Sequence, residues 1–82
     1  MLENLIFHSP RIFYEIEKEG DSYGINVYFE GFENSEDSSK RCRVKNISRD
    51  IKTTAEFVSI ISASCALPVH IPELARDFLF LM

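Results

Sequence analysis

Cysteine, glycine and proline are all scarce in this chain of 82 residues, which contains two, three and three of them. The two cysteines, Cys42 and Cys65, lie 23 positions apart without a CxxC pattern. That spacing indicates neither a disulfide scaffold nor a zinc site, so we expect two small buried hydrophobic residues, with a disulfide or a reactive thiol as the alternatives. The few glycines form no phosphate-binding loop, and the chain has no internal repeat or low-complexity tract.

Long apolar runs are also missing. The most apolar stretch, residues 57–71, is interrupted by three serines and by Pro68. It is also shorter than the roughly 20 residues that are needed to cross a bilayer. The N-terminus lacks the positively charged segment that precedes the apolar run of a signal peptide. We therefore expect a cytoplasmic protein with no membrane partner.

The chain does contain enough apolar residues for one small core. Hydrophobic residues make up 45% of the sequence and charged residues 27%, which is typical of globular rather than disordered proteins. A chain of this length buries too little surface for two cores, so residues 1–82 are predicted to form a single domain.

The net charge of −4 hides a sharp division along the chain. Residues 1–37 carry nine acidic and two basic side chains, whereas residues 38–52 carry one acidic and six basic side chains. The middle segment therefore has a local field opposite to that of its surroundings.

Two segments near the N-terminus alternate apolar and polar residues with the period of a half-buried strand. They are residues 11–19 and 22–30, and the turn Glu19-Gly20-Asp21 joins them. This pattern predicts a β-hairpin. Residues 31–39, rich in Gly, Asn, Ser and acids, predict a solvated loop.

Residues 40–47 resume the alternation and predict a third strand, paired antiparallel with the second. Cys42 and Val44 then lie on one face, while Arg41, Arg43 and Lys45 project from the other.

The C-terminal third is predicted to form two helices. Thr53 and Glu56 have the spacing of a capping box at the start of the first helix. Its apolar stripe comprises Phe57, Val58, Ile61 and Cys65, which can lie on the sheet. Two prolines follow, and the first helix must end by about Leu67 because proline disfavours helix in the residue before it.

The second helix is predicted to begin at Pro72, or alternatively at Pro68. Its apolar side comprises Leu74, Ala75, Phe78 and Leu79.

Four segments resemble a family of short uncharacterised clostridial and related Firmicutes proteins. They are Tyr23-Gly24-Ile25, Ile47-Ser48-x-Asp50, Phe57-Val58 and the region from Leu67 to Leu79, which reads LPVHIPELARDFL. The family carries a similar SYGI strand, an I-S-x-D start of a helix and an ending that resembles PVHLxxVxxDFL. The resemblance covers roughly residues 12–80 with gaps. It departs from the family pattern at Pro72 and in the serine-rich middle of the first helix.

The resemblance implies a small α+β unit of unassigned function. It supplies no activity, cofactor or catalytic residue to carry across to this chain.

The elbow between the helices, formed by Pro68, His70 and Pro72, is predicted to be structural. An imidazole nitrogen of His70 would bond a backbone carbonyl there, and acid–base or ligand chemistry is the less favoured alternative. A metal site would need three or four converging ligands, yet the histidines and cysteines show no such spacing. We therefore predict no metal, no cofactor and no enzyme activity.

The basic segment is the first candidate binding site. Its six cations are Lys40, Arg41, Arg43, Lys45, Arg49 and Lys52. Alternate cations on a strand can follow the phosphates of a nucleic acid or an acidic partner. The favoured interpretation is local neutralisation, in which Arg41, Arg43 and Lys45 pair across strands with outward glutamates at positions 15, 17 or 30.

The apolar C-terminus is the second candidate. A helix cannot bury all of its last five side chains, Phe78, Leu79, Phe80, Leu81 and Met82, against one small core. Some should therefore contact a protein partner or a second copy of the chain, with Phe78, Phe80, Leu81 and Met82 as the predicted partner-binding residues. The alternative packs Phe80 against Leu5 and Phe7 within the same molecule.

Together these observations predict an α+β fold, a three-stranded antiparallel β-meander with two C-terminal helices packed on one face. The predicted function is a non-enzymatic protein-interaction or regulatory module. Its simplest form is a homodimer joined by its C-terminal helix. The alternative function is nucleic-acid binding through residues 40–52.

Overall fold

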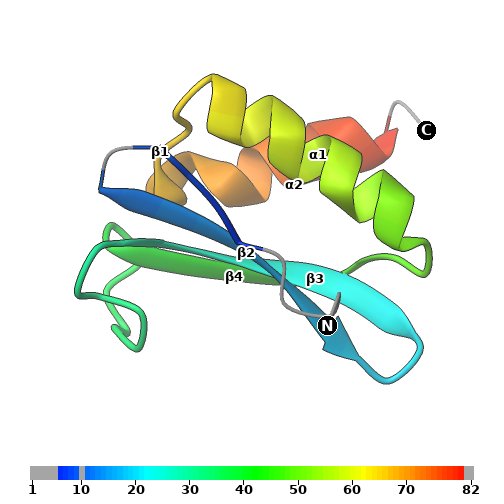
Figure 1. Ribbon diagram of the computed structural model, residues 1–82, viewed down its shortest axis with the longest axis horizontal. Helices are drawn as coiled ribbons and strands as arrows, with labels where there is room; N and C mark the ends of the chain where they lie inside the picture. Colours follow the sequence, from blue (N-terminus) through cyan, green and yellow to red (C-terminus); the bar gives the residue numbers. More distant parts are fainter. Residues whose placement is uncertain (1–5, 10, 81–82) are drawn as a thin grey trace.

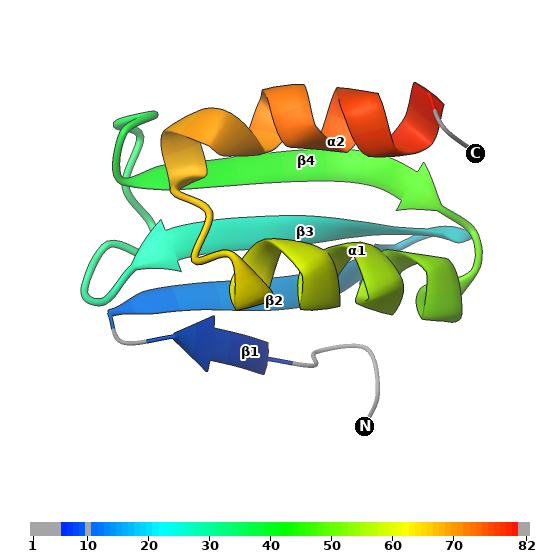
Figure 2. The same ribbon diagram turned by 90° about the horizontal axis from the view of Figure 1, so that it is seen from above.

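The protein has two layers, an antiparallel sheet and a pair of α-helices that both lie on one of its faces (Figures 1 and 2). The computed structural model describes the backbone of residues 6–9 and all atoms of residues 11–80. The elements in chain order are β1 (Ile6–Ser9), β2 (Ile12–Glu19), β3 (Ser22–Phe29), β4 (Arg41–Ser48), α1 (Ile51–Ala63), the 3-10 turn η1 (Pro68–His70) and α2 (Ile71–Phe80). The four strands lie in the order β1-β2-β3-β4, so each pairs with its neighbour in the sequence.

The predicted α+β fold, with its meander and two helices on one face, is confirmed. β2, β3 and β4 are the three predicted strands, and the two-residue turn between Glu19 and Ser22 closes the predicted hairpin. β1 was not predicted, and it extends the meander by pairing Ile6 with Glu15 and Ser9 with Ile12. Its four residues are too few to establish a period of two, so the sequence pattern could not reveal it.

The hydrophobic core lies between the sheet and the helices. α1 contacts all four strands, and α2 lies over β4 (Figure 2). The buried apolar residues are Ile12, Tyr14, Ile16, Ile25, Val27, Ile47, Phe57, Val58, Ile61, Ile71 and Ala75. The rings of Phe57 and Phe78, whose centroids are 4.9 Å apart, join the two helices above the sheet.

Tyr14 links the centre of the sheet to the segment between the helices. Its side chain is fully buried, and its hydroxyl donates a hydrogen bond of 2.9 Å to the carbonyl oxygen of Ala66. A buried tyrosine hydroxyl needs such a partner, because an unpaired polar group in the core costs free energy. This bond fixes where the chain leaves α1 relative to β2.

The start of α1 differs from the prediction. Asp50 is the N-cap, and its carboxylate accepts hydrogen bonds from the Lys52 backbone N–H at 3.0 Å and from the Thr53 hydroxyl at 3.3 Å. The predicted capping box of Thr53 and Glu56 is therefore wrong, because aspartate is the stronger cap and draws the helix start towards it. Asp50 is the aspartate of the I-S-x-D segment.

The end of α1 also differs, and it removes Cys65 from the apolar stripe. The Cys65 N–H donates to the Ser62 oxygen at 3.1 Å and the Ala66 N–H to the Ile61 oxygen at 2.9 Å, the two bonds of a Schellman motif. Cys65 takes the left-handed conformation of this motif, with φ of +55°. Its side chain is exposed, and Cys42 is half-buried; both are free thiols. The prediction of a buried Cys65 is thus wrong.

The elbow contains features of both predicted alternatives. Pro68 is buried and begins η1, and η1 runs directly into α2 at Ile71, so Pro72 lies in the first turn of α2. There it removes no helical hydrogen bond. His70 closes the turn with its backbone N–H, which donates to the Leu67 oxygen at 2.9 Å. Its side chain is exposed, and the predicted imidazole bond to a carbonyl is not among the hydrogen bonds of the described residues.

Replacing Cys65 with glycine should stabilise the fold, because glycine adopts the left-handed conformation without the penalty that a Cβ brings. After allowing for the greater freedom of glycine in the unfolded chain, we expect a gain of about 0.5–1 kcal/mol in the free energy of unfolding. Ser64→Gly is the matched control, since Ser64 has a φ of −92° and should gain nothing. Urea denaturation followed by circular dichroism measures both; an equal gain in the two variants would contradict this account.

Candidate functional site

The basic strand β4 lies at one edge of the sheet, with its cations on the face that the helices leave open. Cys42 and Val44 pack against the core, as the alternation predicts. Arg41, Arg43 and Lys45 therefore project from the opposite face.

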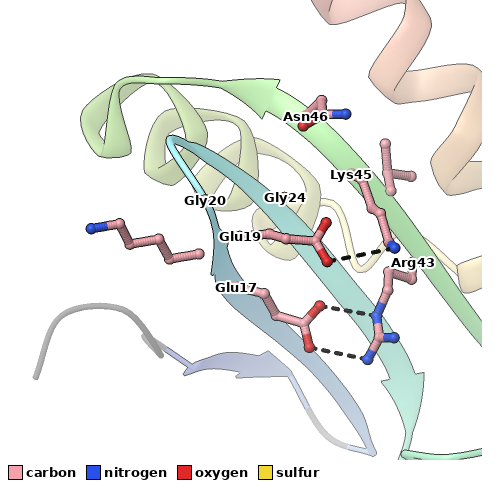
Figure 3. Close-up of a pocket in the computed structure, with 9 residues that line it drawn as sticks. Glu17, Glu19, Gly20, Gly24, Arg43, Lys45 and Asn46 are labelled. Carbon is pink, nitrogen blue, oxygen red and sulfur yellow. Dashed lines mark hydrogen bonds and ion pairs between the residues drawn. The ribbon is translucent and has the colours of Figure 1, made fainter.

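Two of these cations form ion pairs that reach across β3 to the acidic strand β2 (Figure 3). Arg43 binds the Glu17 carboxylate with both Nε, at 2.9 Å, and Nη2, at 3.2 Å. The Lys45 Nζ lies 3.6 Å from a carboxylate oxygen of Glu19. The predicted neutralisation within the chain is thus confirmed for both cations. Arg43 pairs with Glu17, which was among the predicted partners, whereas Lys45 pairs with Glu19, which was not. Such partly exposed pairs each contribute roughly 0.2–1 kcal/mol.

Gly24 makes this bridging possible. It lies on β3 between Glu17 of β2 and the Val44–Asn46 segment of β4, and it has no side chain to separate the charged groups (Figure 3). A Cβ at this position would overlap the carbonyl oxygen of Val44 and would lie 2.9 Å from the Lys45 Cα. β4 therefore approaches β3 as closely as only glycine allows. Gly24 belongs to the SYG segment of the sequence.

A bulge in β4 accompanies this close approach. Tyr23 pairs with Ser48 and Ile25 with Val44, so β4 spans four steps where β3 spans two. Asn46 takes a φ of +58° within the bulge, and its side-chain oxygen accepts a hydrogen bond from the Ser22 hydroxyl. The bulge shifts the alternation by one residue, which turns Ile47 into the core.

The other four predicted cations are dispersed. The Lys40 Nζ lies 5.9 Å and 5.3 Å from the ring centroids of Phe29 and Phe32, and the Arg41 Nε donates to the Ser35 oxygen at 2.7 Å. Both contacts hold the 31–39 loop against β4. Arg49 and Lys52 are exposed near the start of α1, and neither forms an ion pair with the part of the chain that the structure describes.

The open face also contains polar residues that are buried although no helix covers them. Asn26 is 3% exposed and Tyr28 is 9% exposed. The Tyr28 ring stacks on Phe13 with centroids 5.5 Å apart. The Asn26 Oδ1 has no hydrogen-bond partner among the described residues. Sequence reasoning placed these residues on the outward face but gave no sign that they were buried, because burial there depends on neighbours from three strands.

Glu15 lies beside Asn26 in the register of β2 and β3. Burial is the main cause that raises the pKa of its carboxyl, and the negative charge of Glu17 raises that pKa further, while Arg43 opposes the change. Burial similarly raises the pKa of Tyr28, with Glu15 as the next cause. Burial on the open face thus disfavours the charged forms of both Glu15 and Tyr28.

The C-terminal half of α2 divides into a packed and an exposed part. Phe78 is half-buried against the core, whereas Leu79 is 39% and Phe80 87% exposed. Phe80 therefore does not pack inside the molecule, and that alternative is wrong. Leu79 was predicted on the packed side of the helix, but it is exposed. Leu81 and Met82 lie outside the described residues.

Two further observations limit what the described residues can do. No three His, Cys, Asp or Glu side chains among them converge as a metal site. None of the helices in the described ranges combines the length and apolar character that a bilayer span requires.

Substituting Gly24 with alanine should destabilise the fold by about 3 kcal/mol, because the new Cβ meets backbone atoms that cannot move without breaking the bulge. Gly20→Ala is the control. Gly20 also has a positive φ, of +61°, but nothing lies within 4 Å of a Cβ there, so only about 1 kcal/mol should be lost. Chemical denaturation of the two variants compares them, and equal losses would argue against a steric role for β4.

Glu15→Gln should gain stability relative to the wild type as the pH rises. A raised pKa means that the folded protein holds the proton more tightly than the unfolded chain. The contribution of Glu15 is therefore complete below its unfolded pKa and is lost as the pH rises through the folded pKa. Unfolding free energies at about pH 3 and about pH 7 test this.

Asp37→Asn provides a control of opposite sign. The Ser39 N–H and hydroxyl donate to the Asp37 carboxylate at 2.9 Å and 2.8 Å and lower its pKa. Asp37 therefore stabilises the fold above its unfolded pKa, and this variant should lose stability with rising pH. A Glu15→Gln variant that follows the same trend would refute the assignment.

Comparison with known proteins identifies a family but no function. No curated protein and no solved structure matches the chain significantly. A family model described as "Family of unknown function (DUF6514)" matches residues 3–80. Since this match covers nearly all of the sequence, the chain belongs to the DUF6514 family of unknown function.

Proposed function

We propose that this protein is a non-enzymatic protein-interaction module that binds its partner through the exposed end of α2. The observation that supports this proposal is the 87% exposure of Phe80, which lies five residues after the core residue Ala75 and beside the exposed Leu79. Large apolar side chains that gather at one place on a small protein favour an interface, since burying an aromatic anchor is a strong source of binding energy.

A second copy of the chain is the simplest partner. In a two-fold symmetric dimer the same patch of each subunit faces its counterpart, so one apolar helix end would cover the other. The exposed charges of α2 are of mixed sign, Glu73, Arg76 and Asp77, and two such helices would not repel one another strongly. Leu81 and Met82, which the sequence also predicts to bind the partner, lie outside the described residues.

The proposal includes two further expectations. The charged open face of the sheet would set the orientation of a partner through complementary potentials, and the module would have a regulatory role in the cytoplasm of a Firmicutes bacterium. Nucleic-acid binding has less support. Two of the six cations are paired with glutamates and two others hold the 31–39 loop, which leaves little free charge to follow a phosphate backbone.

Phe80→Ser should weaken self-association. We expect the dissociation constant of the dimer to rise about tenfold or more, because the substitution removes the largest exposed apolar side chain. Ile60→Ser is the matched control, since Ile60 is 54% exposed but lies on α1, away from this end of α2. Sedimentation equilibrium at low and high protein concentration measures both variants.

A monomeric wild type at every concentration would refute the homodimer, and equal effects of the two substitutions would refute the site. If the wild type is a monomer that binds a defined partner protein, and Phe80→Ser abolishes this binding, the chain is still an interaction module. Only the identity of the partner would then change.

A further inference from the structure

The open face of the sheet contains a buried amide that lacks a partner. Ile25 and Val27 point into the core, so Asn26 between them points to the face that the helices do not cover. Its neighbours across the strands are Glu15 on β2 and Arg43 on β4. Asn26 is 3% exposed, yet its Oδ1 accepts no hydrogen bond from any described residue. A buried acceptor without a donor is costly and uncommon, and a ligand that supplies the donor is one physical explanation.

Glu15 beside it forms no ion pair with the described residues, although it lies near enough to Arg43 and Glu17 for both charges to act on its carboxyl. The bidentate bond of Arg43 goes to Glu17, and the structure shows no ion pair between Glu15 and any cation of residues 11–80. Glu15 and Glu17 are two residues apart on the same strand, so both carboxyls lie on the same face. The half-buried Glu15 carboxylate and the Asn26 oxygen therefore require the same thing, a positively charged hydrogen-bond donor.

An aromatic surface adjoins the two acceptors. Phe13 and Tyr28 stack with ring centroids 5.5 Å apart and an interplanar angle of 23°. Phe13 precedes Glu15 by two positions on β2, and Tyr28 follows Asn26 by two positions on β3, so both rings lie on the same face as the acceptors. A flat cation can rest on such rings while its N–H groups reach the oxygens.

We propose that Glu15, Asn26, Phe13 and Tyr28 form a binding site for the guanidinium group of an arginine that a partner protein presents. Arginine fits better than lysine because its planar group has several N–H donors in a fixed arrangement. One edge bonds the Glu15 carboxylate, another N–H bonds the Asn26 Oδ1, and the flat face stacks on an aromatic ring. A lysine ammonium would satisfy the two oxygens less completely and would not stack.

Arg43 and Glu17 lie across β3 next to the site, and their side chains are 41% and 29% exposed. The site is separate from the end of α2, so the inference does not depend on the proposed dimer. A protein that binds through α2 and a protein that presents an arginine to the sheet would be recognised by different faces.

Nuclear magnetic resonance with small probes tests the inference on the intact chain. N-acetyl-arginine amide is added to the isotopically labelled protein, and the side-chain amide signals of Asn26 are followed. N-acetyl-citrulline amide has nearly the same shape without the charge, and N-acetyl-lysine amide has the charge without the planar group. We expect saturable shifts of the Asn26 signals with the arginine probe and much smaller shifts with the other two.

Glu15→Gln should weaken binding of the arginine probe by about 10- to 100-fold, because it removes the charge-assisted hydrogen bond. Glu19→Gln is the matched control. It removes a carboxylate from the same strand and the same face, at a residue that already pairs with Lys45, and should change the affinity little.

Shifts that the citrulline or lysine probe reproduces at equal concentration would overturn the assignment of arginine. Unchanged Asn26 signals, or equal losses in Glu15→Gln and Glu19→Gln, would overturn the site. The wild-type titration decides the matter even if a variant folds poorly, because the signals that are read belong to the site itself.

Discussion

One constraint governs the structure: a single apolar face of the sheet must be covered by two short helices that share little contact with each other. Tyr14 lies at the centre of this arrangement, fully buried, with its hydroxyl bonded to the Ala66 carbonyl where the chain leaves α1. The bond sets the position of α1 over the sheet and the point from which η1 and α2 start. Phe57 and Phe78 then close the gap between the helices. The other face of the sheet is left to side chains alone.

The open face is stabilised by charge rather than by a covering layer. Glu17–Arg43 and Glu19–Lys45 join two strands that are not neighbours, and they do so above Gly24, where β3 has no side chain. Cations and a bulge on β4 also protect the edge of the sheet from pairing with another chain, since charged side chains and an irregular backbone disfavour strand addition. The four cations from Lys40 to Lys45 therefore have a structural explanation, whereas Glu15 on the same face forms no ion pair with the described residues.

The candidate sites were only partly predictable. The apolar C-terminus was recognised because five consecutive apolar residues exceed what one helix face can bury, and the exposure of Phe80 agrees with this. The pairing of Arg43 with Glu17 was anticipated from the alternation alone. The Asn26 and Glu15 cluster was not, because an asparagine in a strand looks the same in the sequence whether water or a ring of neighbours surrounds it. Only the register of three strands brings Phe13, Glu15 and Tyr28 around it.

The sequence by itself determined the fold class, the three long strands, the hairpin turn and, apart from Cys65 and Leu79, the predicted inward faces of both helices, because each depends on periodicity within a continuous segment. The two ends of α1 are also local, but the sequence pattern misplaced them: Asp50 rather than Thr53 is the cap, and a Schellman motif removes Cys65 from the apolar stripe. Tertiary structure decided the features that depend on distant residues. β1 forms because β2 offers a free edge, and the bulge at Asn46 turns Ile47 inward because β4 must pass close to Gly24. Local patterns cannot encode these two outcomes, since each depends on pairing between segments far apart in the chain.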